Sequence, residues 1–217
     1  MQTENRAILF TNGQAKPGFE VNLLPGDFLV AVDGGLRHLK RLGLKPHLLI
    51  GDHDSVDATE VAEIMDAGIE VRRFPPAKDQ TDLELALDFS LKAGYVQIVI
   101  AYPFGERVDH TLGNISLLSR PDLAGKTLSL EDGQVEAHLL DASASLPAQP
   151  GDLVSLIAWG EPAEGIRTKG LEYPLNNESL VPWQTRGISN VALADSIDLD
   201  FKSGRLLVIK TKPISGG

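Results

Sequence analysis

The chain contains the segment Leu48-Leu49-Ile50-Gly51-Asp52-His53-Asp54-Ser55, in which an apolar run ends abruptly at a glycine and two acids. The run is too short for an independent helix, so it predicts a buried strand that leads into a loop. In an extended loop, carboxylates two residues apart can point toward the same place. They repel each other unless a cation lies between them, and their hard oxygen atoms suit Mg²⁺. The alternative is a polar turn in which Asp54 or Ser55 caps the next helix.

The first half of the chain alternates short apolar runs with segments of helical periodicity. Strands are expected at residues 7–10, 28–32, 48–50, 69–74 and 96–101. Four helices are expected to follow the second to fifth strands. Their apolar stripes are Leu36, Leu39 and Leu42; Val61, Ile64 and Met65; Leu83, Leu87 and Leu91; and Leu112, Ile115 and Leu118. This alternation predicts an α/β domain with a parallel sheet and helices on both faces.

After about residue 120, helical periodicity gives way to short alternating runs and turns. Asp132-Gly133 and Ser203-Gly204 each lie between two apolar runs, a pattern typical of β-hairpins. The second half therefore predicts a C-terminal all-β sandwich. We expect the first domain to span residues 1–122 and the second to span residues 123–217.

The composition excludes several classes of function. A formal net charge of −10 disfavours nucleic acid and anionic membranes as partners. The absence of cysteine excludes disulfides, thiolate catalysis and cysteine metal sites. Residues 1–6 show no signal-peptide pattern, and no apolar stretch approaches membrane-spanning length. We therefore expect a soluble, cytoplasmic protein, and its 42 % hydrophobic residues suffice for a sizeable core.

Polar side chains follow the ends of four of the predicted strands. They are Asp33 after the second strand, Asp52 and Asp54 after the third, Lys78, Asp79, Thr81 and Asp82 after the fourth, and Arg107, Asp109 and His110 after the fifth. In open parallel sheets, ligands bind outside the carboxyl ends of the strands, which meet at one edge. The sequence therefore predicts an acidic pocket with one Lys and one Arg, suited to a nucleoside triphosphate held through Mg²⁺.

Each of these residues also has a purely structural interpretation. Asp33 can stabilise the Gly-Gly turn that follows it, and Asp82 can favour the dipole of the helix that it begins. Thr81 can serve only as a helix N-cap. Arg107 and Asp109 can form an ordinary surface ion pair. Their convergence on one edge of the sheet is what favours function.

Seven short motifs, taken in order, resemble the thiamin pyrophosphokinase family. In the first half they are Asn12-Gly13, Asp33-Gly34-Gly35, Gly51-Asp52-His53-Asp54-Ser55, Lys78-Asp79-Gln80-Thr81-Asp82-Leu83, and Gly105-Glu106-Arg107-Val108-Asp109-His110 followed by Asn114. In the second half they are Gly170-Leu171-Glu172-Tyr173-Pro174-Leu175 and Gly187-Ile188-Ser189-Asn190. Each motif alone is weak, but together they cover nearly the whole chain. The sequence departs from the family at His53, where Phe is usual, and at Glu106 and Trp183.

The resemblance implies an enzyme that converts ATP and thiamin to AMP and thiamin diphosphate. It also implies a homodimer with active sites between the subunits. Asp52, Asp54 and Asp82 would hold Mg²⁺, and Asp33 would lie beside the phosphates or a second metal ion. None of the departures removes one of these metal ligands.

The same resemblance implies roles for residues outside the metal site. Arg107 would neutralise oxygens of the transferred group, and Asp109 would orient Arg107 or accept a proton. Further contacts with the nucleotide are implied for Asn12, Asp79, Thr81 and Asn114. Tyr173 would stack on a ring of thiamin, and Ser189 and Asn190 would hydrogen-bond its pyrimidine.

Two other functions remain open from the sequence. Asp-x-Asp after an apolar strand is also typical of aspartyl-phosphate hydrolases, although that class places it after the first strand and here it follows the third. The other alternative is a non-catalytic module that senses a nucleotide or metal. The full set of carboxylates argues against a loss of activity.

Overall fold

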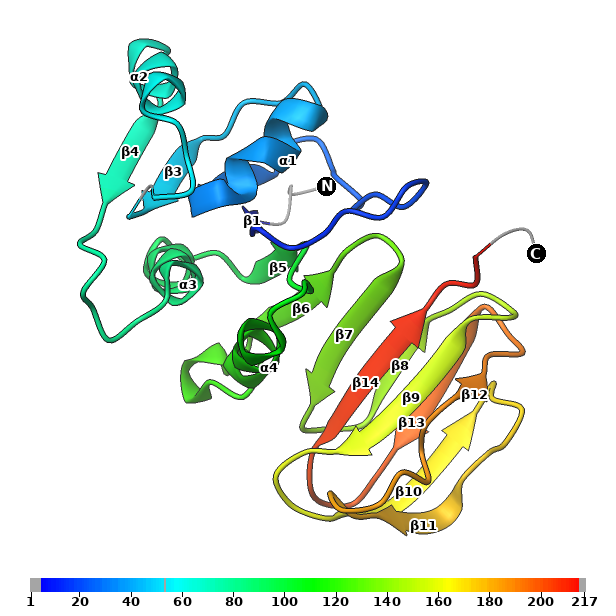
Figure 1. Cartoon of the computed structure of the whole chain (residues 1–217). Helices are drawn as coiled ribbons and strands as arrows, with labels where there is room; N and C mark the ends of the chain where they lie inside the picture. The colour runs from blue at the N-terminus through cyan, green and yellow to red at the C-terminus, as the bar shows by residue number, and fades with distance from the viewer. Residues whose placement is uncertain (1–4, 53, 215–217) are drawn as a thin grey trace. The chain divides into compact units, whose positions relative to one another are not determined.

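The structure is a computed structural model that describes residues 5–52 and 54–214. The chain divides after Gly133 into two compact units, which are coloured from blue to green and from green to red in Figure 1. The division falls later than the joint predicted at residue 122. The reason is that strand β6 (Thr127–Glu131) pairs with β5 (Gln97–Ala101) in the parallel sheet of the first unit.

The first unit is built on a parallel sheet. Its other strands are β1 (Arg6–Phe10), β2 (Phe28–Val32), β3 (Leu48–Gly51) and β4 (Glu70–Arg73). The strand order is β6-β5-β1-β2-β3-β4, and each of these pairings is parallel. All residues from Ala7 to Phe10 are fully buried, as expected for a central strand that is covered on both faces.

Helices pack on both faces of this sheet. They are α1 (Leu36–Arg41), α2 (Ala58–Asp66), α3 (Asp82–Lys92) and α4 (Val108–Leu117), with 3₁₀ turns η1 (Asp33–Gly35) and η2 (Pro121–Leu123). Figure 1 shows α1 and α3 on opposite sides of the sheet. Ile8 and Phe10 of β1 join Leu36 and Leu39 of α1 in one apolar cluster. Because side chains alternate along a strand, the residues between them face the other side, where α3 packs.

One residue in each of two predicted apolar stripes does not face inward as expected. Leu112 of α4 is 55 % exposed, so its predicted inward orientation is wrong, whereas Leu118, just after this helix, is buried. Met65 of α2 is 61 % exposed, whereas its neighbour Ile64 is buried. Periodicity shows which side chains share a helix face, but it does not show whether another element of the chain covers that face.

The second unit is a β-sandwich. Its strands are β7 (Val135–Leu140), β8 (Ala144–Pro147), β9 (Leu153–Ala158), β10 (Ala163–Lys169), β11 (Asn176–Leu180), β12 (Asn190–Val191), β13 (Ser196–Asp200) and β14 (Leu206–Thr211). They form two antiparallel sheets, β12-β9-β14-β7 and β11-β10-β13-β8. Leu156 and Val208 of the first sheet share a core with Ile166 and Ile197 of the second. The predicted fold class, an α/β domain followed by a β-sandwich, is confirmed.

The turn at Ser203-Gly204 does not close the hairpin that was predicted there. Strand β13 pairs with β8 and β10, whereas β14 pairs with β7 and β9. The turn therefore carries the chain from one sheet of the sandwich to the other. The hairpin prediction is wrong because turn residues indicate a reversal of direction but do not select which strands pair. Among the helices of the described residues, none combines the length and the apolarity that a membrane span needs.

A cluster of charged side chains on β7 and β14 ties the stability of the second unit to pH. Glu136 Oε1 lies 2.5 Å from His138 Nε2, and Glu136 Oε2 lies 2.8 Å from Lys210 Nζ. Burial alone would raise the pKa of Glu136, but the interactions with His138 and Lys210 outweigh burial and lower this pKa to about 2. The folded chain therefore holds the carboxylate ionised at a pH where the unfolded chain protonates it.

We expect this lowered pKa to stabilise the sandwich above about pH 5, and the contribution to disappear as the pH falls toward 2. Its full size is on the order of 3 kcal/mol. Glu136→Gln should lower the melting temperature at pH 7 and flatten its decline between pH 5 and pH 2. Thermal melts across this range test the expectation. Glu161→Gln, at an exposed position, is the control. If the melting temperatures of wild type and Glu136→Gln declined in parallel as the pH falls, the expectation would be contradicted.

Candidate active site

Three of the predicted acids meet at the carboxyl ends of β2 and β3. One carboxylate oxygen from each of Asp33, Asp52 and Asp54 lies within 4.8 Å of the others. The two strands are adjacent and parallel, with Val32 opposite Ile50, so both exits open at the same edge of the sheet. The backbone N–H of Asp54 also donates to Asp52 Oδ1 at 3.1 Å, which holds this turn in shape. His53, which departs from the family pattern between these acids, lies outside the described residues.

Asp33 occupies an unusual backbone position. Its φ is 46°, in the left-handed region that few residues other than Gly adopt at low energy. The following residues leave no room for side chains, because a Cβ on Gly35 would lie 1.8 Å from the Phe10 carbonyl oxygen. A Cβ on Gly34 would lie 2.7 Å from Asn12 Cγ, so the Asn12 side chain packs directly on this turn. Strain that the surroundings hold in place is typical of functional sites.

The Asp33 carboxylate fits a bound cation. Burial raises its pKa, and the neighbouring Asp54 and Asp52 carboxylates raise it further, against hydrogen bonds from Ser55 and the Gly34 N–H. Among the described residues, none donates a hydrogen bond to its buried Oδ1 atom. A hard divalent cation such as Mg²⁺ would satisfy this oxygen and relieve the repulsion between the carboxylates.

Asp82 lies beside this group and is paired with a lysine. Lys78 Nζ lies 3.0 Å from Asp82 Oδ1 and 3.9 Å from Asp52 Oδ2. Lys78 therefore links the acid at the start of α3 to the acids at the end of β3. The role of Asp82 as a metal ligand stays a prediction. Thr81 caps α3, since its Oγ1 accepts a hydrogen bond from the Glu84 N–H at 3.2 Å.

Arg107 and Asp109 form a two-pronged pair at the start of α4. The distances are 2.5 Å from Nη2 to Oδ2 and 3.3 Å from Nε to Oδ1, and the side chains are 69 % and 63 % exposed. This hydrogen bonding raises the pKa of Arg107 and lowers that of Asp109. A carboxylate with a lowered pKa is a poor proton acceptor, so the geometry favours the orienting role for Asp109 over the role of a base.

The other residues that were predicted to contact the nucleotide lie in different surroundings. Asn114 donates from Nδ2 to the Pro103 carbonyl at 2.8 Å and so holds the loop that follows β5. Asp79 is exposed on the loop that precedes α3. Asn12 is exposed at the end of β1, beside the Asp33 turn. Their contacts with a nucleotide stay predictions.

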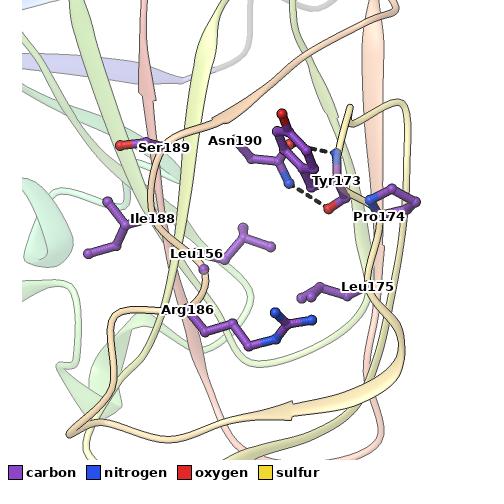
Figure 2. Close-up of a pocket in the computed structure, with 9 residues that line it drawn as sticks. Leu156, Tyr173, Pro174, Leu175, Arg186, Ile188, Ser189 and Asn190 are labelled. Atoms are coloured by element: carbon purple, nitrogen blue, oxygen red, sulfur yellow. Dashed lines mark hydrogen bonds between the residues drawn. The ribbon is translucent and has the colours of Figure 1, made fainter.

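The second unit contains a cavity of about 220 Å³ that brings together Tyr173, Ser189 and Asn190 (Figure 2). Asn190 Nδ2 donates to the Tyr173 carbonyl at 2.7 Å, and Asn190 Oδ1 accepts from the Tyr173 N–H at 3.0 Å. These bonds fix the backbone of Tyr173, whose side chain is 66 % exposed. The exposed ring offers a flat face to a ligand. Asn190 thus acts on Tyr173 as well as facing the cavity.

The cavity also has lining residues to which the sequence analysis assigned no role. Leu156 of β9 and Ile188 are apolar, and Arg186 pairs with Glu178 through Nε at 2.8 Å. Figure 2 shows Arg186 at the opposite end of the cavity from Tyr173 and Asn190. The position of Arg186 directly before the Gly187-Ile188-Ser189-Asn190 motif was an available signal. Leu156 has no such signal, because only the folded chain brings it to this motif, where its N–H donates to the Gly187 carbonyl at 2.8 Å.

Both halves of the chain match known protein domains. Residues 23–129 match the thiamin pyrophosphokinase catalytic domain, and residues 143–206 match the thiamin pyrophosphokinase vitamin B1 binding domain. A thiamine pyrophosphokinase of Bacillus subtilis is 30 % identical over 192 residues, which cover 84 % of this chain and 86 % of the relative.

Solved structures agree with these matches. The crystal structure of the thiamine pyrophosphokinase from Bacillus subtilis has a TM-score of 0.83 and 27 % identity, over 96 % of this chain and 99 % of the other. A thiamin pyrophosphokinase family protein from Enterococcus faecalis has a TM-score of 0.82 and 25 % identity, over the same shares of the two chains, 96 % and 99 %. The chain therefore belongs to the thiamin pyrophosphokinase family, as its seven motifs predicted.

Proposed function

We propose that this protein transfers the pyrophosphoryl group of ATP to the hydroxyl group of thiamin, giving AMP and thiamin diphosphate. The observation that carries the proposal is the group of carboxylates from Asp33, Asp52 and Asp54, in a chain whose two halves match both domains of the family. The relative and the solved structures that bear the name thiamine pyrophosphokinase support the same activity.

The proposed metal site takes Asp52, Asp54 and Asp82 as ligands of Mg²⁺, with Asp33 beside the phosphates or a second ion. The clustering of Asp33 with Asp52 and Asp54, and its buried oxygen without a hydrogen-bond donor among the described residues, make Asp33 a ligand candidate too. When bound, the cation supplies positive charge that offsets the charge of the ATP phosphates. Lys78 adds a fixed positive charge between Asp52 and Asp82.

The proposed reaction is an in-line displacement at phosphorus. The thiamin hydroxyl oxygen bonds to the β-phosphorus of ATP, and the bond from that phosphorus to the oxygen shared with the α-phosphate breaks, so AMP leaves. Catalysis of such a transfer consists mainly of positioning and charge neutralisation. Arg107 offers the planar fork of donors that suits two oxygens of the moving group, and Asp109 keeps the fork oriented. Asn12, Asp79, Thr81 and Asn114 complete the proposed nucleotide side.

In this proposal, the α/β half binds the nucleotide and the β half binds thiamin. The cavity with Tyr173, Ser189 and Asn190 supports the second assignment, since thiamin carries flat rings and one is a cation that favours an aromatic face. Both substrates must meet within one site for the hydroxyl to reach phosphorus. We propose a homodimer in which each site combines the α/β half of one subunit with the β half of its partner. The cytoplasmic localisation stays a prediction.

One assay separates this function from its alternatives. Purified protein is incubated with labelled ATP, thiamin and Mg²⁺, and the products are separated. AMP and thiamin diphosphate in equal amounts support the proposal. Release of free phosphate instead would support the phosphohydrolase, and binding of ATP without turnover would support the sensing module.

Arg107→Lys is expected to leave ATP binding nearly unchanged and to lower kcat by about 10²-fold, because a point charge cannot reproduce the planar fork. Isothermal calorimetry with ATP and steady-state turnover are the two measurements. Arg73→Lys, at the exposed last residue of β4, is the matched control. An unchanged kcat in Arg107→Lys would show that this arginine is a surface residue without a role in the transfer.

A further inference from the structure

The loop that follows β1 is held by two side chains from α1. Arg37 Nη2 donates to the carbonyl oxygens of Asn12 and Gly13, each at 2.8 Å. His38 Nε2 lies 2.9 Å from the same Gly13 oxygen. Three contacts therefore converge on two consecutive carbonyl groups.

The state of His38 is suited to this contact. The ring is 4 % exposed and stacks on Tyr102 with centroids 4.2 Å apart. The pKa of His38 is lowered to about 4, mainly by burial and also by the charges of Arg37 and Arg41, although the hydrogen bond to Gly13 opposes this shift. The ring is thus neutral at neutral pH and carries a single N–H. Since a carbonyl can only accept, that proton belongs on Nε2.

The loop is fixed from the other side by the end of β5. The Gly13 N–H donates to the Tyr102 carbonyl at 3.0 Å, and Thr11 Oγ1 donates to the same oxygen at 2.6 Å. Gly13 cannot be replaced without movement, because a Cβ there would lie 2.0 Å from this oxygen. The loop is therefore held between α1 and the β5 exit, which leaves the Asn12 side chain packed on the turn that carries Asp33.

From this geometry we infer that Arg37 and His38 are positioning residues, which set the Asn12-Gly13 loop for binding of the nucleotide at the carboxylate edge. The inference rests on the proposed function in one respect, that Asn12 and its loop lie on the ATP side of the site. Neither side chain needs to touch the nucleotide for this role. No sequence pattern selects either residue, because neither is an acid or part of a strand exit.

Arg41 offers a matched comparison on the same helix. Its Nη2 donates to the Tyr102 hydroxyl at 3.0 Å, and its Nη1 lies 3.6 Å from Glu20 Oε1. Arg41 thus shares its helix with both residues, its charge with Arg37 and its Tyr102 neighbour with His38. Its described hydrogen bonds, however, do not go to Asn12 or Gly13.

The test compares Arg37→Met, His38→Leu, His38→Gln and Arg41→Met with wild type. KM for ATP, KM for thiamin, kcat and melting temperature are measured for each, and ATP affinity is measured by calorimetry. We expect Arg37→Met and His38→Leu to raise KM and Kd for ATP about tenfold and to change KM for thiamin less than twofold. His38→Gln, whose amide N–H can replace Nε2–H, should recover most of the affinity. Arg41→Met should keep wild-type values for both substrates.

A double-mutant cycle of Arg37→Met with Asn12→Ala tests whether Arg37 acts through the loop. If Arg37 acts through the loop, adding Arg37→Met to Asn12→Ala should weaken ATP binding by less than the product of the two single effects. Full additivity, an unchanged Kd for ATP in Arg37→Met, or an equal loss of both substrates would overturn the inference. Arg37 is exposed, so its variant remains informative if His38→Leu does not fold. A wild type that binds ATP without making thiamin diphosphate would reject the proposed function, and calorimetry would still decide the positioning role.

Discussion

Asp54→Asn and Asp52→Asn should each remove nearly all pyrophosphoryl transfer while leaving the fold intact. An amide has no charge and is a poor ligand for Mg²⁺, so it cannot replace either carboxylate in the group formed with Asp33. Loss of the cation from its place beside the phosphates should cost about 4 kcal/mol of transition-state stabilisation, about a thousandfold in rate. Turnover and circular dichroism melts are measured on the same samples.

Because the three acids repel each other, the melting temperature provides a second test of this expectation. Replacing one carboxylate reduces the negative charge around Asp33, so the melting temperature without Mg²⁺ should stay equal or rise. Added Mg²⁺ should stabilise the wild type more than either variant. Asp66→Asn, at an exposed position on α2, is the control for removing a carboxylate elsewhere. Wild-type turnover in both site variants would exclude these acids as metal ligands.

Two inactive variants should restore activity to each other if the sites lie between subunits. The acids belong to the first unit, and the cavity with Asn190 belongs to the second. Asn190→Ala removes both bonds to the Tyr173 backbone, so we expect it to lose thiamin binding and turnover. In a mixed dimer of Asp54→Asn and Asn190→Ala, one site would carry both changes and the other neither. Random exchange of equal amounts should then return about one quarter of wild-type activity.

The mixing experiment has a direct control. Subunit exchange is followed by native mass spectrometry of differently tagged chains, and activity is measured on the same mixture. A mixture of Asp54→Asn with Asp52→Asn should stay inactive, because both changes lie in the same half of the site. If mixed dimers form and the Asp54→Asn and Asn190→Ala mixture also stays inactive, each site is built within a single chain.

Patterns along the chain are enough to predict the order of the elements and the edge of the sheet at which the functional residues lie. Parallel strands separated by helices place their exits on one side, so Asp33, Asp52 and Asp54 were predictable as neighbours without coordinates. The caps were predictable for a similar reason. Thr81 caps the helix that begins at Asp82, because an N-cap interaction spans only a few residues of the chain.

The partners of side chains from distant segments could not be predicted in this way and are known only from the folded structure. The approach of Lys78 to Asp52, the hydrogen bonds of Asn190 to Tyr173, and those of Arg37 to Asn12 each depend on distances set by strand register and loop path. Whether Leu112 is covered likewise depends on what packs against its helix. These choices are competitions among several nearby donors, acceptors and apolar surfaces. Local pattern describes the competitors, but only the folded chain brings them within the few ångströms at which one of them prevails.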